Sequence, residues 1–365
     1  MISLLAALAL APEPFRFVQI PAMVDYNSGL QERALDEAQR LSAGITVSVG
    51  FTDASGIAAQ ARFPTWKYFE QVVGGALDRK IPKIRLKIGG GPPPHPSWLA
   101  LNDGQPWEEP YRPPHGPDNA LWKRLVYYKQ AVIDRAVTLV QVAKRDPKQV
   151  LEIELATEPG KGGSGGPWRG APGAYGPAVR AYPEGVWDLG FHEELSFECQ
   201  NLDFRGLPVL SPSFEFQSDE TFAQELSSAQ SAMGEGWRSK VNVWVVNVYA
   251  QAKVGPDGSL EGPLRTFAAK ALEARDALRR TFGQNVAIAV GEYGWTAKSL
   301  GVQGRSDAEG LRGRALRESE SLLKQAGFLS ASLYTMVDDR ETPGFGMFDR
   351  RFSTDAVREG FLAAP

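Results

Sequence analysis

Short runs of β-branched and other apolar residues recur along the chain, separated by longer segments whose apolar residues follow the spacing of one helical face. The short runs predict strands, and the longer segments predict helices. Alternation of strand with helix is typical of a parallel sheet, because each helix carries the chain back across the sheet. Eight runs of this kind predict a closed (β/α)8 barrel, at residues 15–20, 45–51, 81–88, 150–156, 207–212, 241–249, 285–292 and 328–337.

Amphipathic segments between these runs are expected to form the outer helical ring, because each is apolar on one face and charged on the other. The clearest are residues 28–43, 119–145, 264–283 and 309–327. A doubly wound open sheet would share the alternation, but it usually has a glycine-rich phosphate-binding turn after its first strand. The sequence FVQIPAMVDYNSG stands there instead. We therefore favour an α/β barrel, with residues 15–365 forming a single domain.

Residues 1–14 precede the first predicted strand and contain an apolar run that ends in small residues. Such a run resembles the end of a secretory signal, although the basic residues that usually begin one are missing. A truncated signal would favour a secreted or periplasmic location over a cytoplasmic one, and an ordinary apolar lead-in is the alternative. The run is too short to span a bilayer, and the sequence predicts no membrane span elsewhere.

Two connections rich in glycine, proline and aromatic residues follow the third and fourth predicted strands, at residues 89–119 and 159–187. Long loops are often functional, and in a barrel the active site is assembled at the carboxyl ends of the strands. Trp98, Trp107 and Trp168 lie in these loops and are candidates for stacking on sugar rings. The alternative is that each tryptophan fills a small hydrophobic cluster within its own loop.

Composition limits the partners and the catalytic groups that the chain can use. The formal net charge is −3, which gives no broad attraction for polyanions, so we do not expect a nucleic-acid partner. The chain has one cysteine and three histidines, too few for a disulfide framework or a cysteine-rich zinc site. We therefore expect no metal and no cofactor, and catalysis that depends on carboxylates, hydroxyls or amides. An uncharged carbohydrate fits this balance, while the oligomeric state stays open.

Three glutamates share one side of the fourth predicted strand, because residues at even spacing along a strand point the same way. They are Glu152, Glu154 and Glu158. Buried carboxylates must be paired, hydrogen-bonded or protonated, so the cluster indicates either a structural network or a catalytic site. We favour the network for Glu154 and catalysis for Glu158, which stands at the tip of the strand.

The seventh predicted strand is apolar until it reaches a single acid, Glu292. The tips of strands four and seven face each other across the mouth of an eight-stranded barrel, so Glu158 and Glu292 could converge on one ligand atom. Retaining glycosidases need two carboxyls about 5 to 5.5 Å apart, one protonated to assist the leaving oxygen and one ionised to attack the anomeric carbon.

These motifs resemble those of the clan A glycoside hydrolases, which include family-5 cellulases, mannanases and related β-glycosidases. Their fourth strand commonly ends in E-x-x-N-E-P, similar to Glu154, Glu158 and Pro159 here. The resemblance implies that Glu158 is the general acid/base and Glu292 the nucleophile. It also implies that Tyr249, in a pattern where the family carries His-x-Tyr, hydrogen-bonds the nucleophile.

The chain departs from the family pattern at several positions. Thr157 replaces the asparagine that contacts the sugar 2-hydroxyl, and Asn247 replaces a histidine of the sixth strand. The eighth strand offers Tyr334 where the family often has a tryptophan platform, which leaves the platform unassigned. From the resemblance, the expected substrate contacts outside the loops are Thr157, Asn247, Tyr249, Trp295 and Tyr334.

The sequence thus predicts hydrolysis of β-glycosidic bonds in an oligo- or polysaccharide, with retention, through Glu158 and Glu292. Two alternatives stay open. The departures at Thr157 and Asn247 are compatible with a catalytically silent barrel that binds glycans. A transglycosylase would use the same residues and differ in excluding water from the acceptor site.

Overall fold

The computed structural model describes residues 14–20, 29–49, 66–88, 120–155, 201–216, 222–223, 226–227, 229–230, 238–338, 344–352 and 355–363. The apolar N-terminal run and the two long connections of the sequence analysis lie outside these residues.

Eight parallel strands close into a barrel in the order β1 to β8, with β8 pairing back onto β1. The predicted (β/α)8 fold is confirmed, and each strand overlaps the run predicted for it. The strands are β1 Arg16–Gln19, β2 Gly44–Val49, β3 Ile84–Ile88, β4 Leu151–Glu154, β5 Val209–Glu215, β6 Val243–Tyr249, β7 Ala287–Gly294 and β8 Ala331–Leu333.

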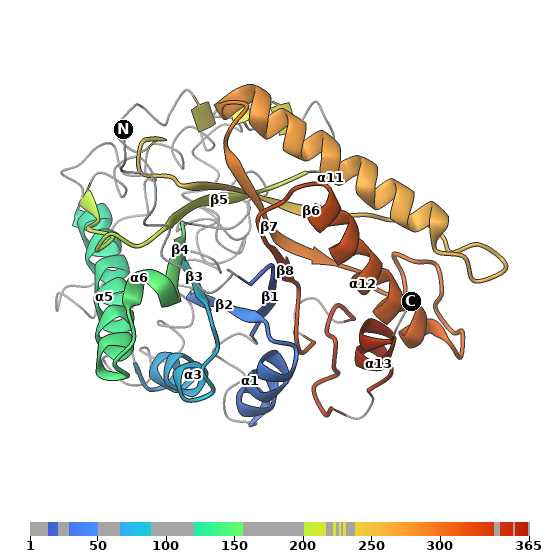
Figure 1. Ribbon diagram of the computed structural model, residues 1–365, viewed down its shortest axis with the longest axis horizontal. Coiled ribbons are helices and arrows are strands. Elements are labelled where there is room, and N and C mark those ends of the chain that lie inside the picture. Colours follow the sequence, from blue (N-terminus) through green and yellow to red (C-terminus); the bar gives the residue numbers. More distant parts are fainter. Residues whose placement is uncertain are drawn as a thin grey trace, which may run out of the picture.

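Helices surround the strands, as Figure 1 shows. The four amphipathic segments predicted as helices appear as α1 Leu30–Arg40, α5 Ala120–Val142, α11 Glu261–Phe282 and α12 Ala308–Gln325. The structure adds α3 Trp66–Asp78, α6 Pro147–Val150 and α13 Ala356–Leu362. Because charged residues occupy the outer faces of the long helices, their apolar faces pack on the barrel and bury the main hydrophobic core.

Alternation along each strand separates this core from the barrel interior. On β6, Trp244 belongs to the core between sheet and helices and stacks on Phe282 of α11, with ring centroids 3.5 Å apart. Val243 and Val245 instead join a separate cluster with Leu210 and Ala289. Odd-numbered residues of β6 therefore face into the barrel, which directs Asn247 and Tyr249 toward its mouth.

The interior between β3 and β4 is charged. Arg85 of β3 is in register with Glu152 of β4, and its Nε donates to Glu152 Oε1 over 2.6 Å. Nη2 of the same guanidinium donates to Ser330 Oγ over 2.8 Å, and the group lies 4.3 Å from the ring centroid of Phe17. These contacts compensate the burial of Glu152, which belongs to a structural network.

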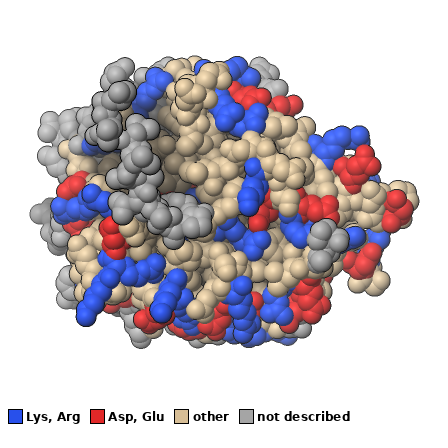
Figure 2. Space-filling model, viewed as in Figure 1, with Lys and Arg blue, Asp and Glu red and all other residues tan. Residues whose placement is uncertain are grey.

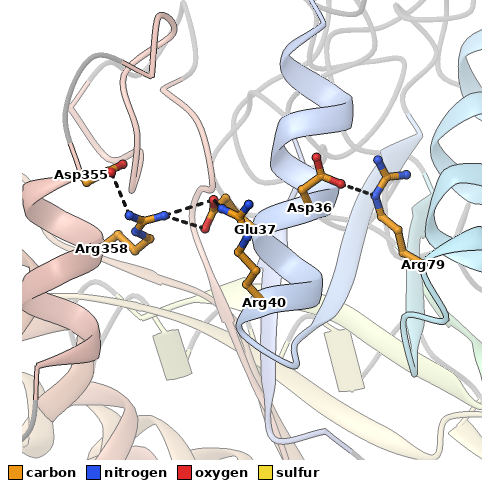
Figure 3. A network of polar contacts seen from close by, with 6 residues as sticks. All are labelled: Asp36, Glu37, Arg40, Arg79, Asp355 and Arg358. Atoms are coloured by element: carbon orange, nitrogen blue, oxygen red, sulfur yellow. Dashed lines mark hydrogen bonds and ion pairs between the residues drawn. The ribbon is translucent and has the colours of Figure 1, made fainter.

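Ion pairs join α1 to α13 and to the end of α3 outside the barrel (Figure 3). Arg358 of α13 contacts Glu37 of α1, with 3.2 Å between Nη1 and Oε1, and Arg40 pairs with the same carboxylate. Arg79, just after α3, donates through Nε to Asp36 over 2.8 Å. Glu37 is buried while Asp36 is half exposed, so we expect the Glu37 contacts to contribute more to closing the ring of helices.

The carboxyl ends of β5 and β8 differ most from the predicted runs. The fifth predicted strand ends at Pro212, but β5 continues to Glu215. A register shift between Leu210 and Ser213 accommodates the proline, which has no N–H to pair, and Ser211 Oγ accepts a 2.8 Å bond from Val245 N. In contrast, β8 ends at Leu333. Beyond it, Tyr334 N donates to Tyr293 O of β7 and Met336 N to Gln19 O of β1, before Val337 pairs with Phe348.

On the face shown in Figure 2, positive and negative side chains are interspersed around the rim and do not gather into patches of one sign. No helix in the described part of the chain combines the length and the apolar character that a membrane span requires.

Candidate active site

Glu292 reaches the barrel mouth because of an irregularity in β7. Val245 pairs with Ala289 and Val246 with Val290, but Asn247 pairs with Glu292, so β7 carries one extra residue. The pairing of β7 with β8 shifts across the same stretch. An extra residue of this kind is a β-bulge, which re-aims the side chains beside it. The bulge turns Glu292 into the barrel, where simple alternation from Ala289 would direct it outward.

The residue that makes this bulge must be a glycine. A Cβ on Gly291 would lie 2.6 Å from Val245 Cγ1 and 2.7 Å from Asn247 Oδ1, distances that a real side chain does not reach. The sequence Gly291-Glu292 therefore combines a close approach of two strands with the delivery of one carboxylate. Asn247 itself is fully buried in the interior.

Each oxygen of the Glu292 carboxylate has a different partner. Lys87 Nζ of β3 donates to Oε1 over 2.8 Å, and the Tyr249 hydroxyl of β6 donates to Oε2 over 2.8 Å. The residue is 7% exposed, so both bonds lie in a largely water-excluded site. A cation on one oxygen and a hydroxyl donor on the other hold the carboxylate in one orientation, as a nucleophile requires.

A second carboxylate shares the same lysine. Glu154 Oε1 on β4 lies 3.4 Å from Lys87 Nζ, and Lys87 and Glu154 are in register on adjacent strands. Glu154 is fully buried. Burial raises the pKa of its carboxyl, and the charge on Glu292 adds to the rise, while Lys87 and Arg85 act in the opposite direction. Glu154 was expected from the sequence to belong to a polar network, and the structure places it in one that includes Glu292.

Sequence reasoning missed Lys87, although the strand carried a signal for it. In Ile84-Arg85-Leu86-Lys87 the two cations alternate with apolar residues, as Glu152 and Glu154 do on the next strand. Two cations and two carboxylates with the same period on neighbouring strands predict facing pairs inside a barrel. The contact between Lys87 and Glu292 has no such local signal, because the two residues are far apart in sequence.

Three aromatic rings meet beside Glu292 at the mouth. Phe345, which follows β8, packs edge-on against Tyr249 with centroids 5.6 Å apart, and against Tyr334 with centroids 5.7 Å apart. A Cβ on Gly294 would lie 2.8 Å from Phe345 Cδ1, so a glycine at this position permits the approach. Tyr249 and Tyr334 were expected from the sequence at the substrate site, whereas Phe345 was not.

Phe345 and Tyr249 line a cavity of about 570 Å³ at the tips of β6 and β7. Its remaining described wall mixes polar and apolar residues and includes neither Glu292 nor another carboxylate: Ala250, Gln251, Gly294, Thr296, Ala297, Lys298, Ser299, Gln303 and Gly344. An aromatic surface with amide and hydroxyl groups around it is suited to a sugar ring, which has apolar faces and polar edges. A hollow of about 690 Å³ between α11 and α12 has no strand residue in its described wall.

Trp295 does not lie at the mouth, contrary to the expectation that it contacts substrate. Its side chain is fully buried, and the indole Nε1 donates to Ser319 Oγ of α12 over 2.9 Å. The ring also packs against Phe267 of α11, with centroids 5.9 Å apart. After the bulge the chain alternates again, so Trp295 faces the helical layer, as Tyr293 does.

The other predicted site residues lie outside the described part of the chain. They are Glu158, Thr157, Trp98, Trp107 and Trp168. Among the described residues, no group of three or more histidine, cysteine, aspartate or glutamate side chains is placed to share a metal ion.

Comparisons with known proteins agree on the fold. No protein-family model and no curated sequence matches the chain. An intracellular xylanase from Thermoanaerobacterium saccharolyticum superposes with a TM-score of 0.55 at 11% identity, covering 96% of this chain and 95% of that one. A structure of fungal β-1,4-galactanases superposes with a TM-score of 0.54 at 11% identity, covering 98% of this chain and 100% of that one. A monomeric β-xylosidase from Caulobacter crescentus CB15 superposes with a TM-score of 0.53 at 12% identity, covering 97% of this chain and 69% of that one. The chain therefore has the barrel fold that its resemblance to the clan A glycoside hydrolases implied.

Proposed function

We propose that the protein is a retaining glycoside hydrolase that cleaves β-glycosidic bonds in an oligo- or polysaccharide. The observation that carries this proposal is the Glu292 carboxylate, which a glycine-dependent bulge turns into the barrel mouth and which both Lys87 and Tyr249 bind at 2.8 Å. A carboxylate that is buried, bound by a cation and fixed in direction is the group that a double-displacement mechanism requires as its nucleophile.

In the first step, a lone pair on Glu292 attacks the anomeric carbon while the bond from that carbon to the leaving oxygen breaks. Glu158 acts as general acid and gives its proton to the leaving oxygen. In the second step Glu158 takes a proton from water, and the water oxygen displaces Glu292 from the anomeric carbon. Glu292 is then free again as a carboxylate, and the configuration at the anomeric carbon is retained.

The described wall of the mouth supports a neutral sugar as substrate. Phe345 and Tyr249 offer aromatic faces, and Gln251, Thr296 and Gln303 offer hydrogen-bonding groups around the cavity. Trp98, Trp107, Trp168 and Thr157 are proposed to complete the substrate contacts from the loops after β3 and β4. Aromatic residues on long loops are well suited to this role because loop shape sets which sugar fits.

The test is a panel of aryl β-glycosides with glucosyl, xylosyl and galactosyl groups, chosen because the fold neighbours are named for xylan, xyloside and galactan. The wild-type chain should hydrolyse at least one with a first product of retained configuration. Glu292→Gln should abolish turnover while the circular dichroism spectrum stays unchanged. Inverted product, or substantial turnover by the variant, would refute the mechanism.

A second pair of measurements tests the acid. Glu158→Ala should lose activity on a substrate with a poor leaving group and keep much of it on a dinitrophenyl glycoside, whose leaving group needs no proton. An equal loss on both substrates contradicts the acid role. Glycan binding without any turnover would favour the silent barrel, and transfer to a sugar acceptor in preference to water would favour the transglycosylase.

A further inference from the structure

One buried ammonium group is shared by two carboxylates in the barrel interior. Lys87 Nζ lies 2.8 Å from Glu292 Oε1 and 3.4 Å from Glu154 Oε1. We propose that Glu154 is a positioning residue, which holds Lys87 beneath Glu292 and serves as its counter-ion whenever Glu292 loses its charge. The step at which Glu292 loses its charge rests on the proposed function, whereas the pairing of Glu154 with Lys87 does not.

The need for a second counter-ion follows from the chemistry of the first step. When Glu292 forms its bond to the anomeric carbon, the carboxylate becomes a neutral ester, and the departing oxygen carries away the proton given by Glu158. Lys87 keeps its positive charge throughout. Because its side chain is only 1% exposed, water cannot replace the lost partner.

Glu154 is placed to take this role without touching the substrate. It is in register with Lys87 on the adjacent strand and is fully buried, whereas Glu292 reaches Lys87 from β7. The groups that act on its carboxyl come from several strands: Lys87 and Arg85 from β3, Glu292 from β7 and Ser213 from β5. Neighbouring charge from Glu292 disfavours the ionised form of Glu154, and loss of that charge therefore favours it when Lys87 needs a partner.

A stability cycle tests the pairing without any substrate, because Glu292→Gln imitates the neutral ester. The wild-type chain, Glu154→Gln, Glu292→Gln and the double variant are melted at pH 7.5. Each single variant should lose little, since Lys87 keeps one carboxylate. The double variant should lose at least about 5 °C in Tm beyond the sum of the single shifts, because the ammonium then has neither carboxylate. Additive shifts would overturn the proposal.

The pH dependence of the double variant supplies a second readout. A buried lysine without these partners has a lowered pKa in the folded state, so stability rises with pH between that value and the unfolded value of about 10.4. The excess loss in the double variant should therefore shrink between pH 7.5 and pH 10. An excess that stays constant over this range would indicate a packing defect and would contradict the counter-ion role.

Two further variants serve as controls. Glu152→Gln changes the neighbouring carboxylate of the same strand, which pairs with Arg85, and it should combine additively with Glu292→Gln. If the double variant does not fold, adding Lys87→Met to it should restore folding, because the stranded charge is removed. A triple variant that also stays unfolded would overturn the proposal.

The cycle separates the two hypotheses. A non-additive cycle in a chain that hydrolyses no glycoside would refute the proposed function and leave the pairing standing. Additive Tm shifts in a chain that hydrolyses glycosides would refute the pairing of Glu154 with Lys87 and leave the proposed function standing. In an active enzyme, Glu154→Gln should slow the burst phase that reports ester formation more than it slows steady-state turnover, and equal slowing of both would contradict the counter-ion role.

Discussion

Tyr249 donates a 2.8 Å hydrogen bond from its hydroxyl to Oε2 of Glu292, while Lys87 donates to Oε1 of the same carboxylate. Tyr249→Phe removes this donor and keeps the ring that packs against Phe345. A hydrogen bond to a charged group contributes about 1.5 to 3 kcal/mol, so we expect kcat/KM to fall about 10- to 100-fold with little change in Tm. Tyr293→Phe is the matched control, since its hydroxyl faces Glu320 of α12, and it should leave the rate unchanged. Equal rates for Tyr249→Phe and wild type would contradict the assignment.

Lys87→Met should have a larger effect than the tyrosine variant, because it removes the cation between two buried carboxylates. Two carboxylates without the cation disfavour each other's ionised form, so the acid limb of the pH–rate profile should move to higher pH and kcat/KM at pH 6 should fall about 100-fold. Lys324→Met on the exposed side of α12 is the control, with no expected change. A profile that keeps its position would count against a role for Lys87 in holding the nucleophile ionised.

The sequence predicted the barrel because hydrophobic period, strand order and helix amphipathicity all indicate the same fold. It also placed Glu292 and Tyr249 at strand tips, and the structure joins them. Lys87 was missed because its partner on β7 comes from a strand far along the chain, and Phe345 because it follows β8 in a segment without a pattern. Trp295 was expected at the site only from the family resemblance, and it faces the helical layer because it lies three residues after the inward-facing Glu292.

Gly291→Ala tests the bulge directly. The new methyl group would overlap Val245 Cγ1 at 2.6 Å and Asn247 Oδ1 at 2.7 Å. We expect a loss of about 1 to 3 kcal/mol in the free energy of unfolding, measured in urea, and a fall in kcat/KM from the displaced carboxylate. Gly74→Ala in α3 has nothing within 4 Å of the added methyl and should be neutral or stabilising by up to about 1 kcal/mol. Similar stability of the two variants would show that β7 can adjust.

Because the pKa of Glu154 is raised, the contribution of this residue to stability should depend on pH. Its unfolded pKa is about 4.3, and burial holds the folded value above this. Between the two values the native state binds the extra proton, so this group's contribution to stability falls as pH rises through that window. Glutamine does not titrate, so the stability of wild type minus that of Glu154→Gln should decrease from pH 4 upward in urea titrations.

Asp134 provides a control of opposite sign for this measurement. Its hydrogen bond with Arg205 lowers the pKa of the Asp134 carboxyl, so its contribution is present above the unfolded pKa of about 3.9 and is lost as pH falls. Wild type minus Asp134→Asn should therefore increase with pH, by a small amount because the pair is exposed. If the stability differences for Glu154→Gln and Asp134→Asn change in the same direction with pH, the result would contradict the effect of burial on the pKa of Glu154.

Phe345→Ala tests whether the ring beside Tyr249 and Tyr334 supports a sugar. Removal of the ring takes away an aromatic wall of the mouth cavity, so we expect KM to rise about ten-fold, equivalent to about 1.4 kcal/mol, with a smaller change in kcat. Phe345→Tyr keeps an aromatic face and should preserve KM. Phe352→Ala is a control for the loss of packing, since Phe352 stacks on Phe348 with centroids 4.7 Å apart and does not line the cavity. Phe352→Ala should lower Tm and leave KM unchanged. If Phe345→Ala likewise lowers Tm and leaves KM unchanged, the ring supports Tyr249 and Tyr334 and does not bind the substrate.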